Sequence, residues 1–210
     1  MKIRHFSFLL MLIFAAASLA SCGSGGGAPG SSSSDDTNIL IQSVLLSVDS
    51  DDIDVFSNPT ACPAGTGGKP ESLLTDSTAT VTITAAIPPT NPDNPDPAFV
   101  SPFPANIESC SVSYTSAVTG APIIASTTIY PNCSFSDGST SCTLDLLNIA
   151  RKNQWWDDIL SGENKPAGWP NPEVRYTVVY SCKYQNSFKK EGRLGGRIDI
   201  DLADFLVCGG

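Results

Sequence analysis

The sequence predicts a mainly β protein: a single antiparallel sandwich with one inserted helix and long proline-rich loops. Three observations support this fold class. Apolar side chains recur at every second position in several segments, which is the period of a strand. One segment, residues 145–160, spaces its apolar residues as a helix does. Most of the 16 prolines lie in the stretches between these segments, as expected of loops.

Four segments alternate most clearly between apolar and polar side chains: residues 78–85, 107–115, 174–184 and 194–202. In the third of them six residues fall on one face: Val174, Tyr176, Val178, Tyr180, Cys182 and Tyr184. Shorter strand candidates lie at residues 39–48, 53–56, 123–130 and near 142–144. Seven or eight strands with alternating faces are typical of a sandwich.

The helix predicted at residues 145–160 crosses one end of the sandwich. Its apolar positions at helical intervals are Leu146, Ile149, Ala150, Trp156 and Leu160. Ser161-Gly162 is the expected end, because glycine suits a helix C-terminus. We expect Trp156 to pack on the sandwich and the adjacent Asp157 and Asp158 to lie in water.

Three long loops are predicted at residues 58–75, 87–104 and 161–173, each rich in proline. Loops of this length within a compact domain are uncommon unless they are functional or disordered. Trp169, in the third loop, either marks a contact surface or folds back to fix the loop, and the sequence leaves both interpretations open. Trp155 is the second candidate contact residue.

The chain begins with the three-part pattern of an export signal. Lys2 and Arg4 precede an apolar run at residues 6–17, and small residues follow. Leu19-Ala20-Ser21-Cys22 resembles the lipobox of bacterial lipoproteins. The resemblance implies that a diacylglycerol is joined to Cys22, that the chain is cut before it, and that the new amino group is usually acylated. The alternative is an ordinary signal peptide that leaves Cys22 as a free thiol.

The expected organisation is a signal peptide at 1–21, a lipidated cysteine with a tether at 22–38, and one domain at 39–210. The tether, GSGGGAPGSSSSDDTN after the cysteine, has almost no apolar side chains. As a Gly/Ser coil it would span roughly 20–25 Å. Gly23 follows the lipid-bearing cysteine, and the lipoprotein resemblance then favours the outer membrane, on a face that the sequence does not specify.

The cysteine count fits this organisation. Of 7 cysteines, assigning Cys22 to lipid leaves six, and export places them where disulfides persist. Six cysteines allow fifteen pairings. Cys133 and Cys142 flank a turn signal at Asp137-Gly138, so we expect these two to meet.

The strand order resembles that of immunoglobulin-like and fibronectin-type-III-like ectodomains. The resemblance implies that the first edge strand, near residues 53–56, runs parallel to the last, near 198–207. Cys62 and Cys208 would then lie beyond the same ends and pair. Cys110 and Cys182, on the apolar faces of central strands, are the pair that remains.

Charge and histidine content exclude several function classes. Without the signal, 10 basic residues face 21 acidic ones, and such an acidic body disfavours nucleic acid and anionic lipid headgroups. The one histidine, His5, is lost with the signal, which excludes histidine-dependent catalytic triads, zinc sites and haem sites. The cysteines lack paired Cys-x-x-Cys spacing, so neither a metal nor a cofactor is expected.

Carboxylates are the remaining catalytic resource. Asp157 and Asp158 beside Trp155 are the nearest approach to a glycosidase site, although adjacent helical residues diverge. The acidic run at residues 49–54 lacks the EF-hand spacing for calcium and is expected to be a solvated turn, with an adventitious calcium as the alternative. Asp199 and Asp201 are expected on the wet face of an edge strand.

The sequence therefore predicts a membrane-anchored, non-enzymatic binding or structural module of the cell envelope, contacting an envelope protein or polysaccharide. Two alternatives stay open: an accessory subunit of an envelope assembly or export complex, and a carboxylate-dependent carbohydrate-active hydrolase. The expected contact surface comprises the proline-rich loops with Trp169 and Trp155.

Overall fold

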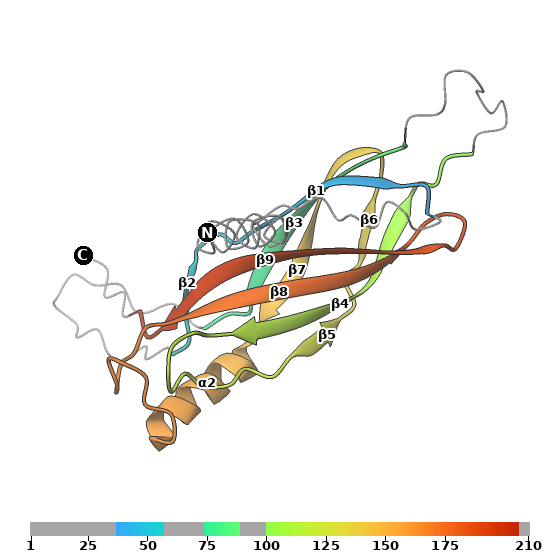
Figure 1. Ribbon diagram of the computed structural model, residues 1–210. Helices are drawn as coiled ribbons and strands as arrows, with labels where there is room; N and C mark the ends of the chain where they lie inside the picture. Colours follow the sequence, from blue (N-terminus) through green and yellow to red (C-terminus); the bar gives the residue numbers. More distant parts are fainter. Residues whose placement is uncertain (1–36, 57–73, 89–99, 206–210) are drawn as a thin grey trace, which may run out of the picture.

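The computed structural model describes residues 37–56, 74–88 and 100–205. Two β-sheets pack face to face into an elongated sandwich, and a helix closes one end (Figure 1). The predicted lipobox, Cys22 and the Cys62–Cys208 pair lie outside the described residues, as do most of the tether and the centres of the first two proline-rich loops.

One sheet has three strands in the order β1 (Leu40–Ser47), β3 (Ser77–Ala86) and β7 (Gly138–Leu147). The other sheet has six strands, ordered β2 (Asp52–Asp54), β9 (Glu191–Ala203), β8 (Val174–Gln185), β4 (Ala105–Thr115) and β5 (Thr127–Ile129), with β6 (Cys133–Phe135) also paired to β4. The helix among the described residues is α2 (Ile149–Ser161). The mainly β prediction is confirmed.

The alternating patterns place the core as predicted. All six apolar-face residues of β8 are buried, from Val174 through Tyr184, and in β3 Ala79, Val81, Ile83 and Ala85 are buried. The two inner faces interdigitate because residues two apart on a strand share a face. The strand periodicity in the sequence was therefore sufficient to identify most of the core.

The first two strands of the chain belong to different sheets. β1 pairs with β3 in the three-stranded sheet, whereas β2 pairs in parallel with β9 in the other, Ile53 lying opposite Leu202. Backbone bonds extend this pairing, since Val55 N–H donates to Ala203 O at 3.1 Å. The predicted parallel approach of the first edge strand to the last is confirmed, and the remaining strand pairs are antiparallel.

Glycines in β9 make room for the tyrosines of β8. Gly192 lies opposite Tyr184, and a Cβ at Gly192 would lie 2.3 Å from that ring. Gly196 lies opposite Tyr180, and a Cβ there would meet Leu46 Cδ1 of the facing sheet at 2.6 Å. The two sheets approach this closely because β9 carries no side chain at these points.

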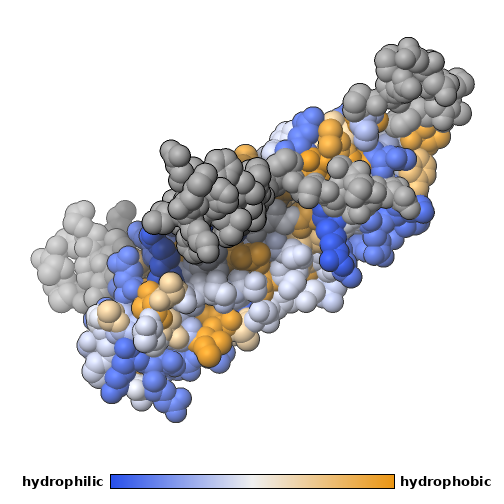
Figure 2. Space-filling view, in the orientation of Figure 1, coloured by the Kyte–Doolittle hydropathy of each residue, from blue (hydrophilic) through white to orange (hydrophobic). Residues whose placement is uncertain are grey.

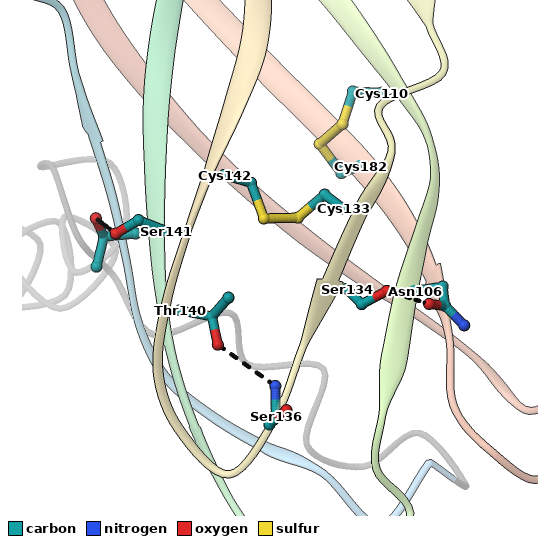
Figure 3. The surroundings of a disulfide bond; sticks show 10 residues. Asn106, Cys110, Cys133, Ser134, Ser136, Thr140, Ser141, Cys142 and Cys182 are labelled. Atoms are coloured by element: carbon teal, nitrogen blue, oxygen red, sulfur yellow. Dashed lines mark hydrogen bonds between the residues drawn. A yellow bond between two sulfur atoms is a disulfide. The ribbon is translucent and has the colours of Figure 1, made fainter.

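Two disulfides join described residues of the sandwich, in pairs expected from the sequence (Figure 3). Cys110 and Cys182 are directly opposed on β4 and β8, with Cα atoms 4.0 Å apart, so this bond lies within one sheet. Cys133 and Cys142 were expected at the ends of a paired hairpin. Instead β6 pairs with β4 and β7 with β3, so this disulfide joins the two sheets.

The helix begins later than the sequence predicted. Residues 145–147 continue β7, because Asp145 and Leu147 pair with β3 and both Leu146 and Leu147 are buried. Asn148 is the N-cap, its side chain accepting from Arg151 N–H at 3.0 Å. The end at Gly162 is as predicted, in a left-handed conformation with φ of 73°.

The apolar face predicted for the helix was wrong in part. The buried side of α2 consists of Lys152, Trp155, Trp156 and Ile159. Leu160 is 58 % exposed and Ile149 is 39 % exposed. Trp156 packs inward as predicted and stacks on Phe56, their ring centroids 5.0 Å apart.

The sandwich has two distinct ends (Figure 1). The helix end carries α2 and the start of β8. The hairpin end carries the β8–β9 turn at residues 186–190 and receives the first described residue, Thr37, whose carbonyl accepts from Asn186 Nδ2 at 2.8 Å. The 12 residues of β8 run between the two ends, a length of about 40 Å.

Candidate binding surface at the helix end

A groove lies between α2 and the segment that leads into β5. Two adjoining cavities of about 190 and 70 Å³ form it, and Arg151 lines both. The larger is bounded by Tyr114, Ile129 and Asn148, and the smaller by Ile123 and Asp158. We call this feature the α2–β5 groove. Because β5 is the last strand of its sheet, the groove runs beside a sheet edge.

Arg151 lies in the groove, and one nitrogen of its guanidinium group has no hydrogen-bond acceptor among the described residues. Its guanidinium lies over the Tyr114 ring, 5.8 Å from the centroid. Nη1 is buried and has no hydrogen-bond partner among the described residues. Such a donor is costly to leave unmatched, so it favours an incoming oxygen acceptor.

Tyrosine hydroxyls fix the walls of the groove. Tyr114 donates to the carbonyl of Leu146, the residue left unpaired where the register of β3 and β7 shifts. Tyr176 donates to Pro122 O at 2.6 Å and accepts from Trp155 Nε1 at 2.8 Å. Burial raises the pKa of Tyr114, and it raises the pKa of Tyr176 to about 12. These buried hydroxyls keep their protons across the physiological range.

Trp155 is a buried residue that lines the smaller cavity of the α2–β5 groove. Its side chain is 1 % exposed, and its indole nitrogen is satisfied by Tyr176. The contact role predicted for Trp155 stays a prediction, since this residue lines the smaller cavity of the groove.

Trp169 combines both interpretations that the sequence left open. Its Nε1 donates to Ile159 O at 3.1 Å, which fixes the third proline-rich loop to the last turn of α2. Its ring is still 46 % exposed, with Lys165 Nζ 5.2 Å from a ring centroid. Trp169 therefore presents an aromatic face from a fixed position.

An acidic cleft of about 260 Å³ lies on the other side of α2, lined by Asp49, Asp52, Asp54 and Asp76. Lys152 lines it too, is 3 % exposed, and donates from Nζ to Thr75 O at 2.8 Å. Burial lowers the pKa of Lys152, and the nearby carboxylates of Asp54 and Asp76 oppose that shift. The cation in this cleft is therefore the ammonium group of Lys152.

Two carboxylates of this cleft accept hydrogen bonds from backbone N–H groups. Asp76 Oδ1 accepts from Ile149 N–H at 2.8 Å, at the start of α2, and Asp54 Oδ1 accepts from Phe56 N–H at 3.2 Å. Across the described residues, no three metal-binding side chains converge as an ion site would require. Of the two aspartates predicted beside the tryptophans, Asp158 lines the α2–β5 groove and Asp157 is exposed.

The placement expected for Asp201 was wrong. β9 is not an edge strand, because β2 pairs beyond it. Asp201 is 5 % exposed, lies opposite Arg175, and accepts from Arg175 Nε at 2.9 Å, which raises the pKa of the arginine. Asp199 is exposed and accepts from Thr177 Oγ1 at 2.6 Å.

Sequence reasoning missed Arg151 and Ile123, the residues that define the groove. Ile123 is 87 % exposed, and only the fold shows that it borders α2. One available signal was the position of Arg151 in the first turn of a helix that lacks acidic residues there.

Comparisons with protein-family models, curated protein sequences and solved structures find no match to the chain. In the part of the chain that the structure describes, no helix is long and apolar enough to cross a bilayer.

Proposed function

We propose that this protein is a lipid-anchored, non-enzymatic binding module of the cell envelope, which holds an extended segment of a partner protein in its α2–β5 groove. The anchor is the diacylglycerol on Cys22, and the outer membrane is the site of attachment. The buried, unmatched Nη1 of Arg151 beside a sheet edge is the observation that carries the binding proposal.

The groove suits an extended peptide. A sheet edge offers backbone donors and acceptors to a further strand. Ile123, at 87 % exposure, offers apolar contact at one end, and a partner carboxylate or carbonyl would satisfy Arg151. Because Thr37 enters the sandwich at the hairpin end, a tether there leaves the helix end facing away from the lipid.

We infer that the sandwich is immunoglobulin-like. The first two strands lie in different sheets, β3 and β7 accompany β1, and β9, β8 and β4 form the centre of the sheet that β2 joins. Tyr180, two residues before Cys182, donates to Asp145 O of β7 at 3.1 Å. Its spacing from the cysteine matches the tyrosine corner of that fold, but its acceptor lies much further back in the chain. The Cys110–Cys182 bond departs from it, because it lies within one sheet.

The anchor is tested by mass spectrometry of the chain isolated from membranes. We expect Cys22 at the N-terminus, carrying diacylglycerol, and a Cys22→Ser chain that is absent from the washed membrane fraction. A chain that begins at another residue without lipid would disprove the anchor.

The groove is tested by chemical crosslinking in intact cells, followed by purification of this chain. We expect one crosslinked protein with wild type, and at least a tenfold loss of that product with Ile123→Asp and with Arg151→Gln. The matched control is Leu45→Asp, which places the same charge at a 57 % exposed position on an edge strand of the other sheet. Equal loss in the control would contradict the assignment of the groove.

The accessory-subunit alternative shares this surface and differs only in the partner, which the crosslinked protein identifies. The hydrolase alternative stays a prediction from sequence. It requires two carboxylates facing across a cleft, and Asp54 and Asp76 already accept backbone hydrogen bonds.

A further inference from the structure

Positive charge is concentrated in one part of this acidic chain. Residues 183–197, the part of the β8–β9 hairpin nearest its turn, contain five basic residues and one acidic residue, Glu191. The basic residues are Lys183, Lys189, Lys190, Arg193 and Arg197, and all are exposed. In the space-filling view hydrophilic and hydrophobic residues are mixed at this end (Figure 2).

The hairpin turn is built to hold one shape. Asn186 is 2 % exposed, and its Oδ1 accepts from the N–H groups of Phe188 and Lys190, both at 2.9 Å. Its own N–H donates to Lys190 O at 3.0 Å, and Ser187 N–H donates to Pro102 O at 2.9 Å. These hydrogen bonds fix the turn before any contact is made. Phe188, which is 44 % exposed, is therefore held beside Lys189 and Lys190.

The chain enters the domain at the same place. Thr37 O accepts from Asn186 Nδ2, and Thr37 Oγ1 lies 3.3 Å from the Tyr184 hydroxyl. A Gly/Ser coil from Cys22 to Thr37 would span about 20 Å. An anchor at Cys22 would thus keep the hairpin end, rather than the helix end, close to the lipid surface.

We propose that the β8–β9 hairpin docks on the anionic lipid headgroups of the anchoring membrane, with Lys183, Lys189, Lys190 and Arg193 on the phosphates and Phe188 at the interface. A basic residue near an anionic surface favours binding about fivefold. The proposal rests on the proposed lipid anchor in one respect: the anchor would keep the hairpin at a high local concentration near the membrane. The basic surface itself is present without a lipid on Cys22.

The overall acidity of the chain does not oppose this contact. Charges are screened over a Debye length of about 8 Å at physiological salt. The acidic cleft lies at the helix end, and β8 spans about 40 Å between the ends. The sequence predicted repulsion from anionic headgroups because it supplies only the total charge, whereas the fold places the acidic cleft and the basic hairpin turn at opposite ends.

The test is lysine footprinting of the purified mature chain in vesicles of phosphatidylcholine alone and of an equimolar mixture with phosphatidylglycerol. A membrane-impermeant acetylating ester modifies exposed amines, and mass spectrometry gives the rate at each lysine. We expect the rates at Lys183, Lys189 and Lys190 to fall at least about fivefold on the anionic vesicles. Lys165, at the helix end, should react equally on both. Salt at about 1 M should remove the protection.

The variant Lys189→Glu/Lys190→Glu should lose the protection of Lys183, and Lys165→Glu should keep it. Equal rates on both vesicles in wild type would overturn the proposal, as would protection that survives the double charge reversal. If mass spectrometry finds no lipid on the chain, the anchor proposal fails independently of the hairpin proposal. The lysine footprint is then measured with the vesicles in excess. Absence of protection there would also overturn the hairpin proposal.

Discussion

Tyr176 links three parts of the structure through one hydroxyl group. It donates to Pro122 O before β5 and accepts from Trp155 of α2, while its own backbone lies in β8. Trp155 is tolerated in the interior because its one donor finds this acceptor. The candidate groove is therefore fixed by a residue that the sequence identified only as part of a core face.

Tyr176→Phe should lower the free energy of unfolding by about 1–3 kcal/mol. The variant keeps the ring but leaves Trp155 Nε1 and Pro122 O buried without their partner. Urea unfolding followed by tryptophan fluorescence measures the change. Tyr130→Phe is the control, since Tyr130 is 78 % exposed, and it should be nearly neutral. A neutral Tyr176→Phe would mean that the hydroxyl is not a structural link.

At the scale of the element, α2 shows how sheet pairing overrides a helical pattern. Residues 145–147 have apolar spacing compatible with a helix, yet they continue β7, which pairs with β3. Each side chain buried in the sheet then gains contacts that one more helical turn would not supply. Sequence periodicity locates such a boundary only within a few residues.

Asn148→Ala should destabilise the protein by about 1 kcal/mol, because the N-cap acceptor of Arg151 N–H is lost. Asp145→Ala should cost much less, since Asp145 is exposed and accepts through its backbone carbonyl. Thermal unfolding of both variants distinguishes the two helix starts. A larger effect at Asp145 would favour the start predicted from sequence.

The two disulfides should differ in their contribution to stability. Their sequence separations are 72 for Cys110–Cys182 and 9 for Cys133–Cys142. Loop-closure entropy gives about 4.4 kcal/mol for the longer loop and about 2.6 kcal/mol for the shorter one. Paired Cys→Ala variants, compared by urea unfolding, should follow that order. The reverse order would show that joining the two sheets matters more than the length of the closed loop.

At the scale of the whole molecule, tyrosine ionisation should set the alkaline limit of stability. Burial raises the pKa values of Tyr114, Tyr176 and Tyr180, the second to about 12. Unfolded tyrosines ionise near pH 10, so between that value and the folded pKa the folded state binds more protons. This contribution is fully present below pH 10 and is lost as pH rises through about 12. Lys152 has the opposite effect: because its pKa is lowered in the folded state, it reduces stability at pH values below the ordinary pKa of lysine.

Urea unfolding between pH 8 and about 12 measures this dependence. We expect stability to fall with a steepening slope above pH 10, and Tyr176→Phe to reduce that slope. Ultraviolet titration should show Tyr130 ionising before the buried tyrosines, since it is 78 % exposed. A slope that Tyr176→Phe leaves unchanged would contradict the role given to its burial.

The sequence alone determined the alternating strands, the end of the helix at Gly162 and the pair Cys133–Cys142, whereas Cys110–Cys182 was only the pair left by the immunoglobulin-like resemblance. Each of the first three is a property of near neighbours in the chain, or of faces set by strand periodicity, so it can be read without the fold. The lipobox and its consequences stay predictions of the same kind, since they lie outside the described residues.

Tertiary structure alone decided which side of α2 is buried, that Asp201 is buried and paired with Arg175, and that Arg151 and Ile123 line one cavity. These depend on contacts between residues far apart in the chain, namely the extension of β7, the addition of β2 beyond β9 and the approach of β5 to α2. It also placed the acidic cleft and the basic residues of the β8–β9 turn at opposite ends of the sandwich. Net charge is a sum over the chain, whereas an electrostatic field at a surface depends on where each charge lies.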